Sequence, residues 1–284
     1  MTQVSTPAEA ATRITGRAVV EQRRLKGAVT EVVLDSGDTV IVKRGHARNA
    51  TAAEAAGLRW LGAADAVRVP EVRGDDDEWL VTELVGDGRP THHAAERLGR
   101  GLAALHAAGA PAFGAAPPGG PADAWIGLAP MRNAAGEDWP RWYAEHRVLP
   151  YVRSAVDDGT LTGGEAEVIE RACARLPEVA GPAEPPARLH GDLWNGNVLW
   201  GAVEVSLIDP AAHGGHRESD LAMLQLFGCP LLDRVLAAYQ EVSPLADGWA
   251  ERIGAHQLFP LLVHTVLFGR SYAGQAVSAA KSVG

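Results

Sequence analysis

The sequence contains little cysteine and no long uncharged apolar run. Its two cysteines, Cys173 and Cys229, are too few for a disulfide framework or a four-ligand zinc site. The most apolar late stretch, residues 256–269, carries two histidines and Pro260 and is shorter than the roughly 20 residues that span a bilayer. We therefore expect a buried helix there, no membrane partner, and a place in the reducing cytoplasm.

Clusters of basic residues are missing as well. Thirty-five acidic residues against 26 Lys and Arg give a formal charge of -9, and no basic stripe could neutralise the phosphates of a duplex. Nucleic acid is thereby excluded as a partner. Residues 1–16 lack the basic and apolar regions of a signal peptide, and their alanines favour the start of a helix. The composition, 46% hydrophobic and 21% charged, is typical of a globular protein.

The first part of the chain has the pattern of a small sheet. Apolar residues alternate with polar ones, and the turn "DSGD" separates two β-branched runs, the second of which ends at Lys43. Residues 46–61 are rich in Ala and Leu at helical spacing. Further strands are expected at residues 67–72 and 78–85, around an acidic turn at 74–78. Residues 1–84 are therefore predicted to form an N-terminal lobe, a small antiparallel sheet with one helix.

The remainder, residues 85–284, is predicted to be a larger and mainly helical lobe. A Gly- and Pro-containing segment, residues 86–90, is expected to link the two parts. Helical periodicity follows in residues 91–109, 138–159 and 163–180, and again from about Glu218 to the end. Short apolar strands around polar loops interrupt it near residues 187–210. The fold class is therefore α+β with two lobes.

Three polar residues suit metal-assisted phosphoryl transfer. Asp192 and Asn197 lie five positions apart in "HGDLWNGN", and Asp209 closes the apolar strand "VSLID". In kinases an Asp accepts the hydroxyl proton, an Asn five residues later binds Mg²⁺, and a further Asp supplies another oxygen ligand. The same residues taken singly would be ordinary turn and strand-end residues. Their combination favours Asp192 as base and Asn197 with Asp209 as ligands of Mg²⁺.

Lys43 has the position of a lysine that pairs with the phosphates of ATP. It ends the β-branched strand "VIVK", and Glu54 on the following helix is expected to hold it by an ion pair. Alternatively, Lys43 ends a strand at the surface and Glu54 is a solvated helix residue. Rival partners for Lys43 are Glu71, Glu78 and Glu83.

The other contacts with ATP are less clearly marked. Gly27 in "LKGAVTE" either permits the close backbone approach of a phosphate loop, with the amides of Ala28 and Val29 facing phosphate, or is part of a plain hairpin turn. "VTELVG" is either a core strand that runs into a turn or a hinge where the backbone of Glu83 and Val85 binds adenine.

With these residues established, the chain resembles the fructosamine kinase (ketosamine-3-kinase) family, a branch of the aminoglycoside-phosphotransferase-like kinases. The resemblance rests on "LHGDLWNGNV" and "IDPAAHGGHRESDLAMLQLFG", supported by "EDWPRWYAEHR" and "HQLFPLLVHTVLFGRSY". It implies a bilobal protein-kinase-like fold, ATP and Mg²⁺ as cofactors, and phosphorylation of the sugar 3-hydroxyl of ketosamines, free or on protein lysines. It also implies the roles assigned above to Lys43, Glu54, Asp192, Asn197 and Asp209.

On the substrate side, Trp194 beside Asp192 is a candidate for a flat apolar sugar contact, and His216 is a candidate that faces the cleft. For His216 a structural role in satisfying buried backbone groups is equally compatible with the sequence. Ala28 in the nucleotide loop and Ala212 with His213 after Asp209 depart from the family pattern. The alternatives are a phosphotransferase for aminoglycosides or other small amino alcohols, and a nucleotide-binding regulatory module. We expect a monomer.

Overall fold

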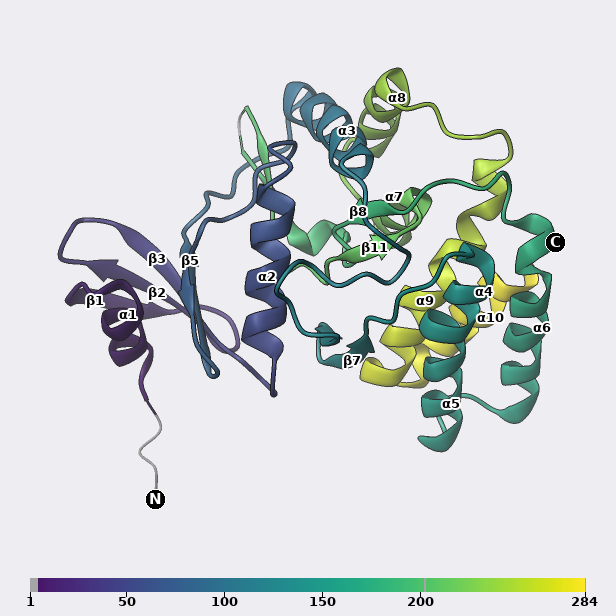
Figure 1. Cartoon of the computed structure of the whole chain (residues 1–284), viewed down its shortest axis with the longest axis horizontal. Coiled ribbons are helices and arrows are strands. Elements are labelled where there is room, and N and C mark those ends of the chain that lie inside the picture. The colour runs from purple at the N-terminus through teal and green to yellow at the C-terminus, as the bar shows by residue number, and fades with distance from the viewer. Residues whose placement is uncertain (1–4, 202, 284) are drawn as a thin grey trace.

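The computed structural model describes residues 5–201 and 203–283. They form two lobes, a sheet-containing lobe at one end of the long axis and a mainly helical lobe at the other (Figure 1). The lobes differ in size as the sequence predicts, and the chain passes between them after the fifth strand.

The small lobe is a five-stranded antiparallel sheet in the order β1-β2-β3-β5-β4. Its strands are β1 (Val19–Arg24), β2 (Val29–Leu34), β3 (Thr39–Arg44), β4 (Val72–Asp75) and β5 (Trp79–Glu83). Because side chains alternate across a strand, the two faces of the sheet bury different residues. Val81 and Trp79 pack with α1 (Pro7–Thr15), while Leu80 packs with α2 (Ala50–Gly62). The two helices therefore lie on opposite faces of the sheet (Figure 1).

Two details of this lobe differ from expectation. The lobe holds two helices where one was expected beside the sheet: α1 lies within residues 1–16, whose alanines favour a helix, and it begins there because Thr6 and Glu9 form a reciprocal capping box and Pro7 occupies the first turn. The strand expected at residues 67–72 begins only at Val72 and continues into the predicted acidic turn. Pro70 has no N–H to donate to a ladder, which accounts for the late start.

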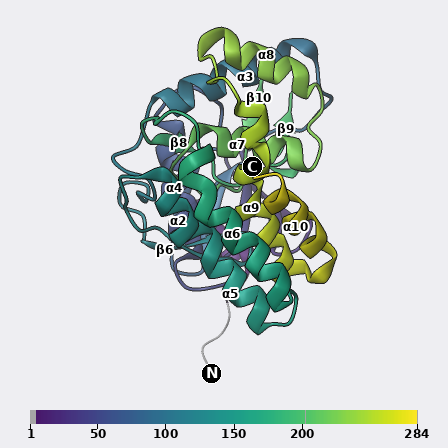
Figure 2. The same ribbon diagram turned by 90° about the vertical axis from the view of Figure 1, so that its right-hand side faces the viewer.

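The large lobe gathers helices around two apolar cores. α3 (His92–Ala107) follows the linker, capped by the Thr91 side chain, and lies against α8 (Leu232–Val242) at the top of Figure 2. The region predicted as a helix at 138–159 comprises α4 (Trp139–Tyr143), the π-helix η1 (Ala144–Val148) and α5 (Leu149–Asp157). The remaining helices are α6 (Gly163–Val179), α7 (Arg217–Leu226), α9 (Trp249–Phe268), the 3₁₀ turn η3 (Arg270–Tyr272) and α10 (Ala273–Lys281).

Short strand pairs in the large lobe carry the polar loops. β8 (Ala187–Leu189) pairs with β11 (His213–Gly215), and β9 (Val198–Trp200) pairs with β10 (Val205–Leu207), all antiparallel. A third pair, β6 (Asp123–Ile126) and β7 (Ala129–Arg132), follows a loop and was not expected from the sequence. The buried helix expected at residues 256–269 is the greater part of α9. Within the described residues, no helix combines the length and apolar character needed to cross a bilayer.

Candidate active site

The loop between β8 and β9 places Asp192 beside Asn197. The 3₁₀ turn η2 (Asn195–Asn197) folds the loop back, and Asn197 Nδ2 donates to the backbone oxygen of Asp192 at 2.8 Å and to its carboxylate at 3.0 Å. The β9–β10 pair then returns the chain, and Ile208 N–H donates to the carbonyl oxygen of Asn197 at 3.0 Å. Asp209, directly after Ile208, is thereby brought next to the loop. The three residues therefore converge as their spacing predicted.

Two residues in this region have left-handed backbones. Gly191 has φ +80°, and a Cβ there would lie 2.1 Å from the carbonyl oxygen of Ala211, so only glycine fits. Asp209 has φ +52°, a conformation that is unfavourable for a non-glycine residue. Such strain is typical of residues whose position is fixed by function, and it turns this carboxylate toward the cleft between the lobes.

A buried carboxylate that the sequence did not identify as functional holds the loop. Asp220, in the first turn of α7, accepts hydrogen bonds from the amides of His190 at 2.8 Å and Gly191 at 2.9 Å. His106 of α3 contacts the same carboxylate at 3.2 Å and Tyr239 of α8 through its other nitrogen. Burial tends to raise the pKa of Asp220, but hydrogen bonds from His106 and Gly191 hold it below its ordinary value. Asp220 therefore fixes the backbone that carries Asp192.

Lys43 reaches the same point from the small lobe. Its Nζ lies 2.7 Å from Glu54 Oε2 on α2 and 3.1 Å from Asp209 Oδ1. The rival partners make other contacts: Glu71 pairs with Arg73, Glu83 pairs with Arg68, and Glu78 accepts from Ser5. The predicted pair of Lys43 and Glu54 is thus present, and it spans the sheet and the helix behind it.

Charges in this cluster shift one another's protonation. Burial of Lys43 opposes its charge, yet the carboxylates of Glu54 and Asp209 raise its pKa above the ordinary value. Burial raises the pKa of Asp192 to about 7, and the nearby carboxylates of Asp209 and Asp220 act in the same direction. A carboxylate with a pKa near neutrality is well suited to accept a proton from a hydroxyl group.

These residues line a cleft of about 320 Å³ between the lobes. Lys43, Glu54, Asp192, Asn197 and Asp209 are linked by polar contacts and form a polar cluster in its wall. Apolar lining comes from α2, the β6–β7 hairpin, the β8–β9 loop and α9, with Ala53, Trp125, Leu128, Trp194, Val263, Leu267 and Phe268 as members. The cleft therefore combines a polar cluster with apolar surface, as a site for a phosphate donor and a second substrate requires.

Trp194, the predicted sugar contact, lies in this cleft and is 38% exposed. A Cβ at Gly196 would come within 2.2 Å of the Trp194 ring. Glycine in "WNGN" therefore lets the indole ring fold over the loop that carries Asp192.

The predicted contacts with nucleotide at Gly27, Glu83 and Val85 are not among the residues that line this cleft. Gly27 has φ +63° in the turn between β1 and β2, where the amide of Val29 donates to Lys26 and so closes the turn instead of facing phosphate. The amide of Glu83 donates to the carbonyl oxygen of Glu71. An adenine contact at Glu83 would thus have to use its carbonyl oxygen, and the roles of these residues stay predictions.

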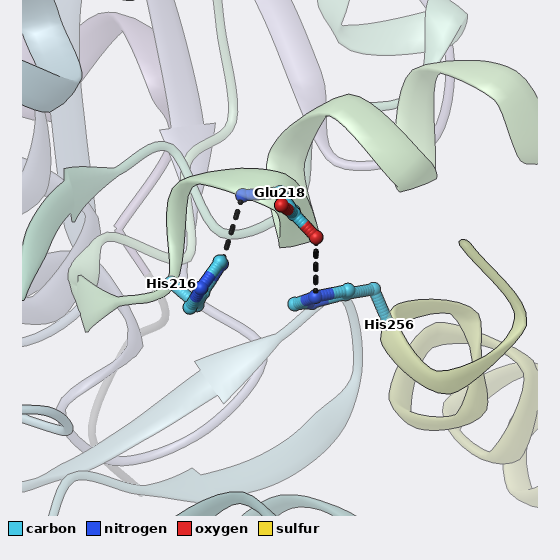
Figure 3. Close-up of side chains that lie close together, drawn as sticks. All are labelled: His216, Glu218 and His256. Carbon is cyan, nitrogen blue, oxygen red and sulfur yellow. Dashed lines mark hydrogen bonds and ion pairs between the residues drawn. The ribbon is translucent and has the colours of Figure 1, made fainter. Parts of the chain in front are cut away.

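His216, the second predicted substrate contact, is not brought to the cleft. It is 3% exposed at the start of α7, where its Nδ1 accepts from the Glu218 amide beside His256 (Figure 3). Its ring also packs against Trp139. Because Nδ1 accepts a hydrogen bond, the ring proton of the neutral imidazole lies on Nε2. The structural alternative, a histidine that caps buried backbone, therefore describes this residue.

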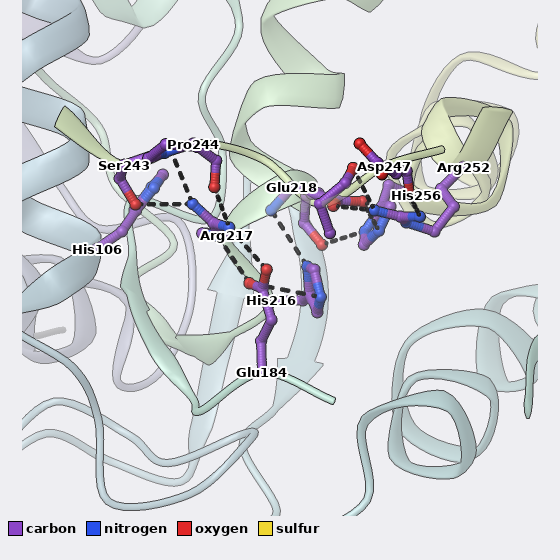
Figure 4. A network of polar contacts seen from close by, with 12 residues as sticks. His106, Glu184, His216, Arg217, Glu218, Ser243, Pro244, Asp247, Arg252 and His256 are labelled. Atoms are coloured by element: carbon purple, nitrogen blue, oxygen red, sulfur yellow. Dashed lines mark hydrogen bonds and ion pairs between the residues drawn. The ribbon is translucent and has the colours of Figure 1, made fainter. Parts of the chain in front are cut away.

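His216 belongs to a buried polar network that joins α7 to α9 (Figure 4). Arg252 donates to both oxygens of Glu218 at 2.9 and 2.6 Å, and His256 Nε2 lies 3.2 Å from the same carboxylate. His216, Glu218 and His256 could in principle hold a metal ion. The donor geometry speaks against it, because Glu218 is already bound by Arg252 and His216 Nε2 carries its proton.

The donors near Asp192 suit a magnesium ion. Asn197 uses its amide nitrogen toward Asp192, which leaves its amide oxygen for a cation, and Asp209 is a half-exposed carboxylate on the same side. Mg²⁺ prefers a small number of such hard oxygen ligands and completes its shell with phosphate and water. The residues present therefore fit the predicted metal.

Comparison with known proteins decides the family. The model of the family described as fructosamine kinase matches residues 2–283. The chain belongs to the fructosamine kinase family. A probable ketoamine kinase of Synechocystis sp. is 35% identical over 233 residues, which cover 79% of this chain and 75% of that protein. The chloroplastic protein-ribulosamine 3-kinase of Arabidopsis thaliana is 30% identical over 235 residues, covering 79% and 69% of the two chains.

A crystal structure from Thermobifida fusca YX-ER1, assigned to fructosamine-3-kinase, superposes with a TM-score of 0.92 at 48% identity and covers 99% of both chains. The fructosamine kinase fold, with its kinase-like α+β architecture, is therefore confirmed for this chain. Family membership also makes the chain a phosphotransferase that acts on a hydroxyl group.

Proposed function

We propose that this fructosamine kinase transfers the γ-phosphoryl group of ATP to the 3-hydroxyl of ketosamines, free or on protein amines, as a repair step in the cytoplasm. The observation that carries the proposal is the convergence of Lys43, Asp192, Asn197 and Asp209 on one cleft. Two of its relatives are named as kinases of ketoamines and of ribulosamines on proteins, which supports the substrate class.

Each residue has a defined task in this reaction. Lys43, held by Glu54, positions the phosphates, and Asn197 Oδ1 with Asp209 would hold Mg²⁺, which neutralises charge on the transferring group. Asp192 accepts a hydrogen bond from the acceptor hydroxyl, orients its oxygen toward the phosphorus, and receives its proton. Little covalent chemistry is required, so positioning and electrostatic stabilisation supply most of the rate.

The charges of the cleft favour a ketosamine over an aminoglycoside. Among the described residues, three acids line the cleft, and Glu54 is paired with Lys43 while Asp209 faces Lys43 and the proposed metal. Asp192 alone is left to attract a cation. A ketosamine carries one amine, whereas an aminoglycoside carries several ammonium groups that need several carboxylates. The apolar lining of the cleft suits the former.

The sugar itself would find polar and flat partners here. Asn133 lines the cleft, and its Nδ2 has no hydrogen-bond partner among the described residues, while its Oδ1 accepts from Arg147 at 2.8 Å. Because this nitrogen is buried in the wall of the cleft, it becomes available to a sugar hydroxyl only when the wall opens. The exposed face of Trp194 offers the apolar surface on which sugar C–H groups pack.

One experiment tests the proposal. Purified enzyme is given ATP and Mg²⁺ with a fructosamine, a ribulosamine or an aminoglycoside, and the position of phosphate on the product is determined by NMR. We expect transfer to the 3-hydroxyl of the ketosamines and a loss of turnover of about 10²-fold or more in Asp192→Asn. The matched control Asp157→Asn alters an exposed carboxylate at the end of α5 and should keep full turnover. Phosphate on aminoglycosides but not on ketosamines would refute the proposal.

A further inference from the structure

Five rings form a continuous surface that leads out of the cleft, and we call it the aromatic ledge: Trp194, Phe227, His264, Phe268 and Tyr272. Trp194 meets Phe227 edge-on at 6.2 Å between centroids, and Phe227 lies 4.6 Å from His264. His264 in turn lies 5.3 Å from Phe268 and 5.1 Å from Tyr272. The ledge thus links the β8–β9 loop to α7, the end of α9 and η3.

The ledge is open to solvent where soluble proteins normally place polar groups. Phe268 is 61% exposed and Trp194 is 38% exposed, and Leu128 at the tip of the β6–β7 hairpin, which lines the same cleft, is 63% exposed. Single exposed apolar residues are ordinary, but a contiguous set at the mouth of a cleft marks a binding surface. All three residues line the cleft.

The rings of the ledge are neutral side chains. Glu54, Asp192 and Asp209, the acids that line the cleft within the described residues, belong to the polar cluster around Lys43. His264 Nδ1 donates to the carbonyl oxygen of Pro260 at 2.7 Å, and burial lowers its pKa, so the ring is neutral at pH 7 and its Nε2 is an acceptor. The faces of aromatic rings attract a cation weakly, so the ledge is also compatible with the protonated secondary amine of a ketosamine.

The position of the ledge relative to Asp192 limits what can occupy it. In a ketosamine the amine nitrogen is four bonds from the 3-hydroxyl oxygen, which is roughly 5 Å with bonds of about 1.5 Å. The substituent on that nitrogen therefore leaves the site close to the reacting oxygen. Phosphate donor and metal ligands occupy the opposite side, because the displacement is in line. Trp194, two residues after Asp192, packs against the sugar in the proposed function, so the substituent extends toward the next rings of the ledge.

We propose that the aromatic ledge binds the group carried by the amine of the ketosamine and makes the enzyme prefer substrates whose amine bears a flat apolar group. This inference rests on the proposed function and concerns the substituent on the amine nitrogen, which the residues that contact the sugar do not select. Phe268, at the outer end of the ledge, is the specificity-determining residue. Its exposure means that truncation removes contact with ligand and leaves the core intact.

The test compares two ketosamines of the same sugar, 1-deoxy-1-(methylamino)fructose and 1-deoxy-1-(benzylamino)fructose. We expect the benzyl compound to have a KM about tenfold lower, as the burial of one ring predicts. Phe268→Ala should raise the KM for the benzyl compound about fivefold and that for the methyl compound less than twofold. Phe268→Trp keeps an aromatic ring and should retain the preference for the benzyl compound. Val242 is an exposed apolar residue at the end of α8, and Val242→Ala should change neither KM.

The possible failures are distinguishable. Equal KM values for the two compounds in the unmodified enzyme would overturn the role of the ledge and leave the proposed function standing. A preference that persists in Phe268→Ala would overturn the assignment to this ledge. Turnover of neither compound, nor of any other ketosamine, would overturn the proposed function and the ledge together.

Discussion

Replacing Asp220 by Asn would test whether a buried carboxylate sets the position of the catalytic loop. Asp220 is 1% exposed, and its carboxylate accepts from two consecutive backbone amides, those of His190 and Gly191, while His106 contacts the same carboxylate. Asparagine has nearly the same shape but presents one acceptor oxygen and one NH₂ group. In either orientation the NH₂ group faces a donor.

The cost follows from these contacts. One buried N–H loses its acceptor, which costs about 1–3 kcal/mol, and the other exchanges a charge-assisted hydrogen bond for a neutral one, which costs about 1 kcal/mol. We therefore expect Asp220→Asn to lower the free energy of unfolding by about 3 kcal/mol. That is less than the ordinary stability of about 5–15 kcal/mol, so the variant should fold. The loop should shift, and a misplacement of about 1 Å costs on the order of 10²-fold in kcat.

The assay has two parts. Urea unfolding gives the loss of stability, and steady-state kinetics with the preferred substrate give kcat and KM for ATP. We expect kcat to fall about 10²-fold while the KM for ATP changes less than threefold, because Lys43 is untouched. Asp157→Asn, an exposed carboxylate, serves as control. Full kcat in a destabilised Asp220→Asn would show that the carboxylate supports the fold and does not position Asp192.

Three further outcomes are expected. Asp209→Ala should abolish the dependence of nucleotide binding on Mg²⁺, so titrations with and without magnesium should coincide, and a retained difference would exclude Asp209 as a metal ligand. Gly191→Ala should lower the free energy of unfolding by several kcal/mol and remove most of the activity. Gly228 also has a positive φ, +74°, but no atom lies within 4 Å of an added Cβ, so Gly228→Ala should lower the free energy of unfolding in urea by only about 1 kcal/mol. Equal losses in the two variants would contradict the steric argument. Burial lowers the pKa of His213 to about 3 and also lowers that of His190, so the unfolded chain takes up these protons first as pH falls below about 6.5. Stability in urea titrations should then drop by up to about 1.4 kcal/mol per pH unit for each histidine below pH 6.5, and a flat profile would show that the folded chain takes up these protons as readily as the unfolded chain.

The parts of the site that the sequence predicts are those defined by local spacing. Asp192 and Asn197 are five residues apart, and a single 3₁₀ turn brings them together, so their spacing in the sequence is enough to predict this contact. Asp209 follows through one short strand pair. The pair of Lys43 and Glu54 was predicted as one choice among several acids, because a strand and the next helix leave few relative placements.

The missed residues depend on long-range contacts. Asp220 and His106 are 114 positions apart, and nothing near Asp220 indicates that its carboxylate reaches the loop of His190. For His216 the sequence left a substrate contact and a structural role equally open, because it does not reveal that α9 covers this residue. The strands β6 and β7 are four residues each and contain Pro130 and charged ends, which is too short for alternation to be detected.

The β6–β7 hairpin has a mechanical consequence for the two lobes. Although it follows α3 in the chain and belongs to the large lobe, Trp125 donates to the carbonyl oxygen of Arg48 at 3.0 Å and packs edge-on against His46, both just before α2. This contact adds to the ion pair of Lys43 with Asp209 and to the hydrogen bond from the Leu207 amide to the Arg68 carbonyl oxygen, which also join the two lobes. The cleft can therefore widen only where these contacts break.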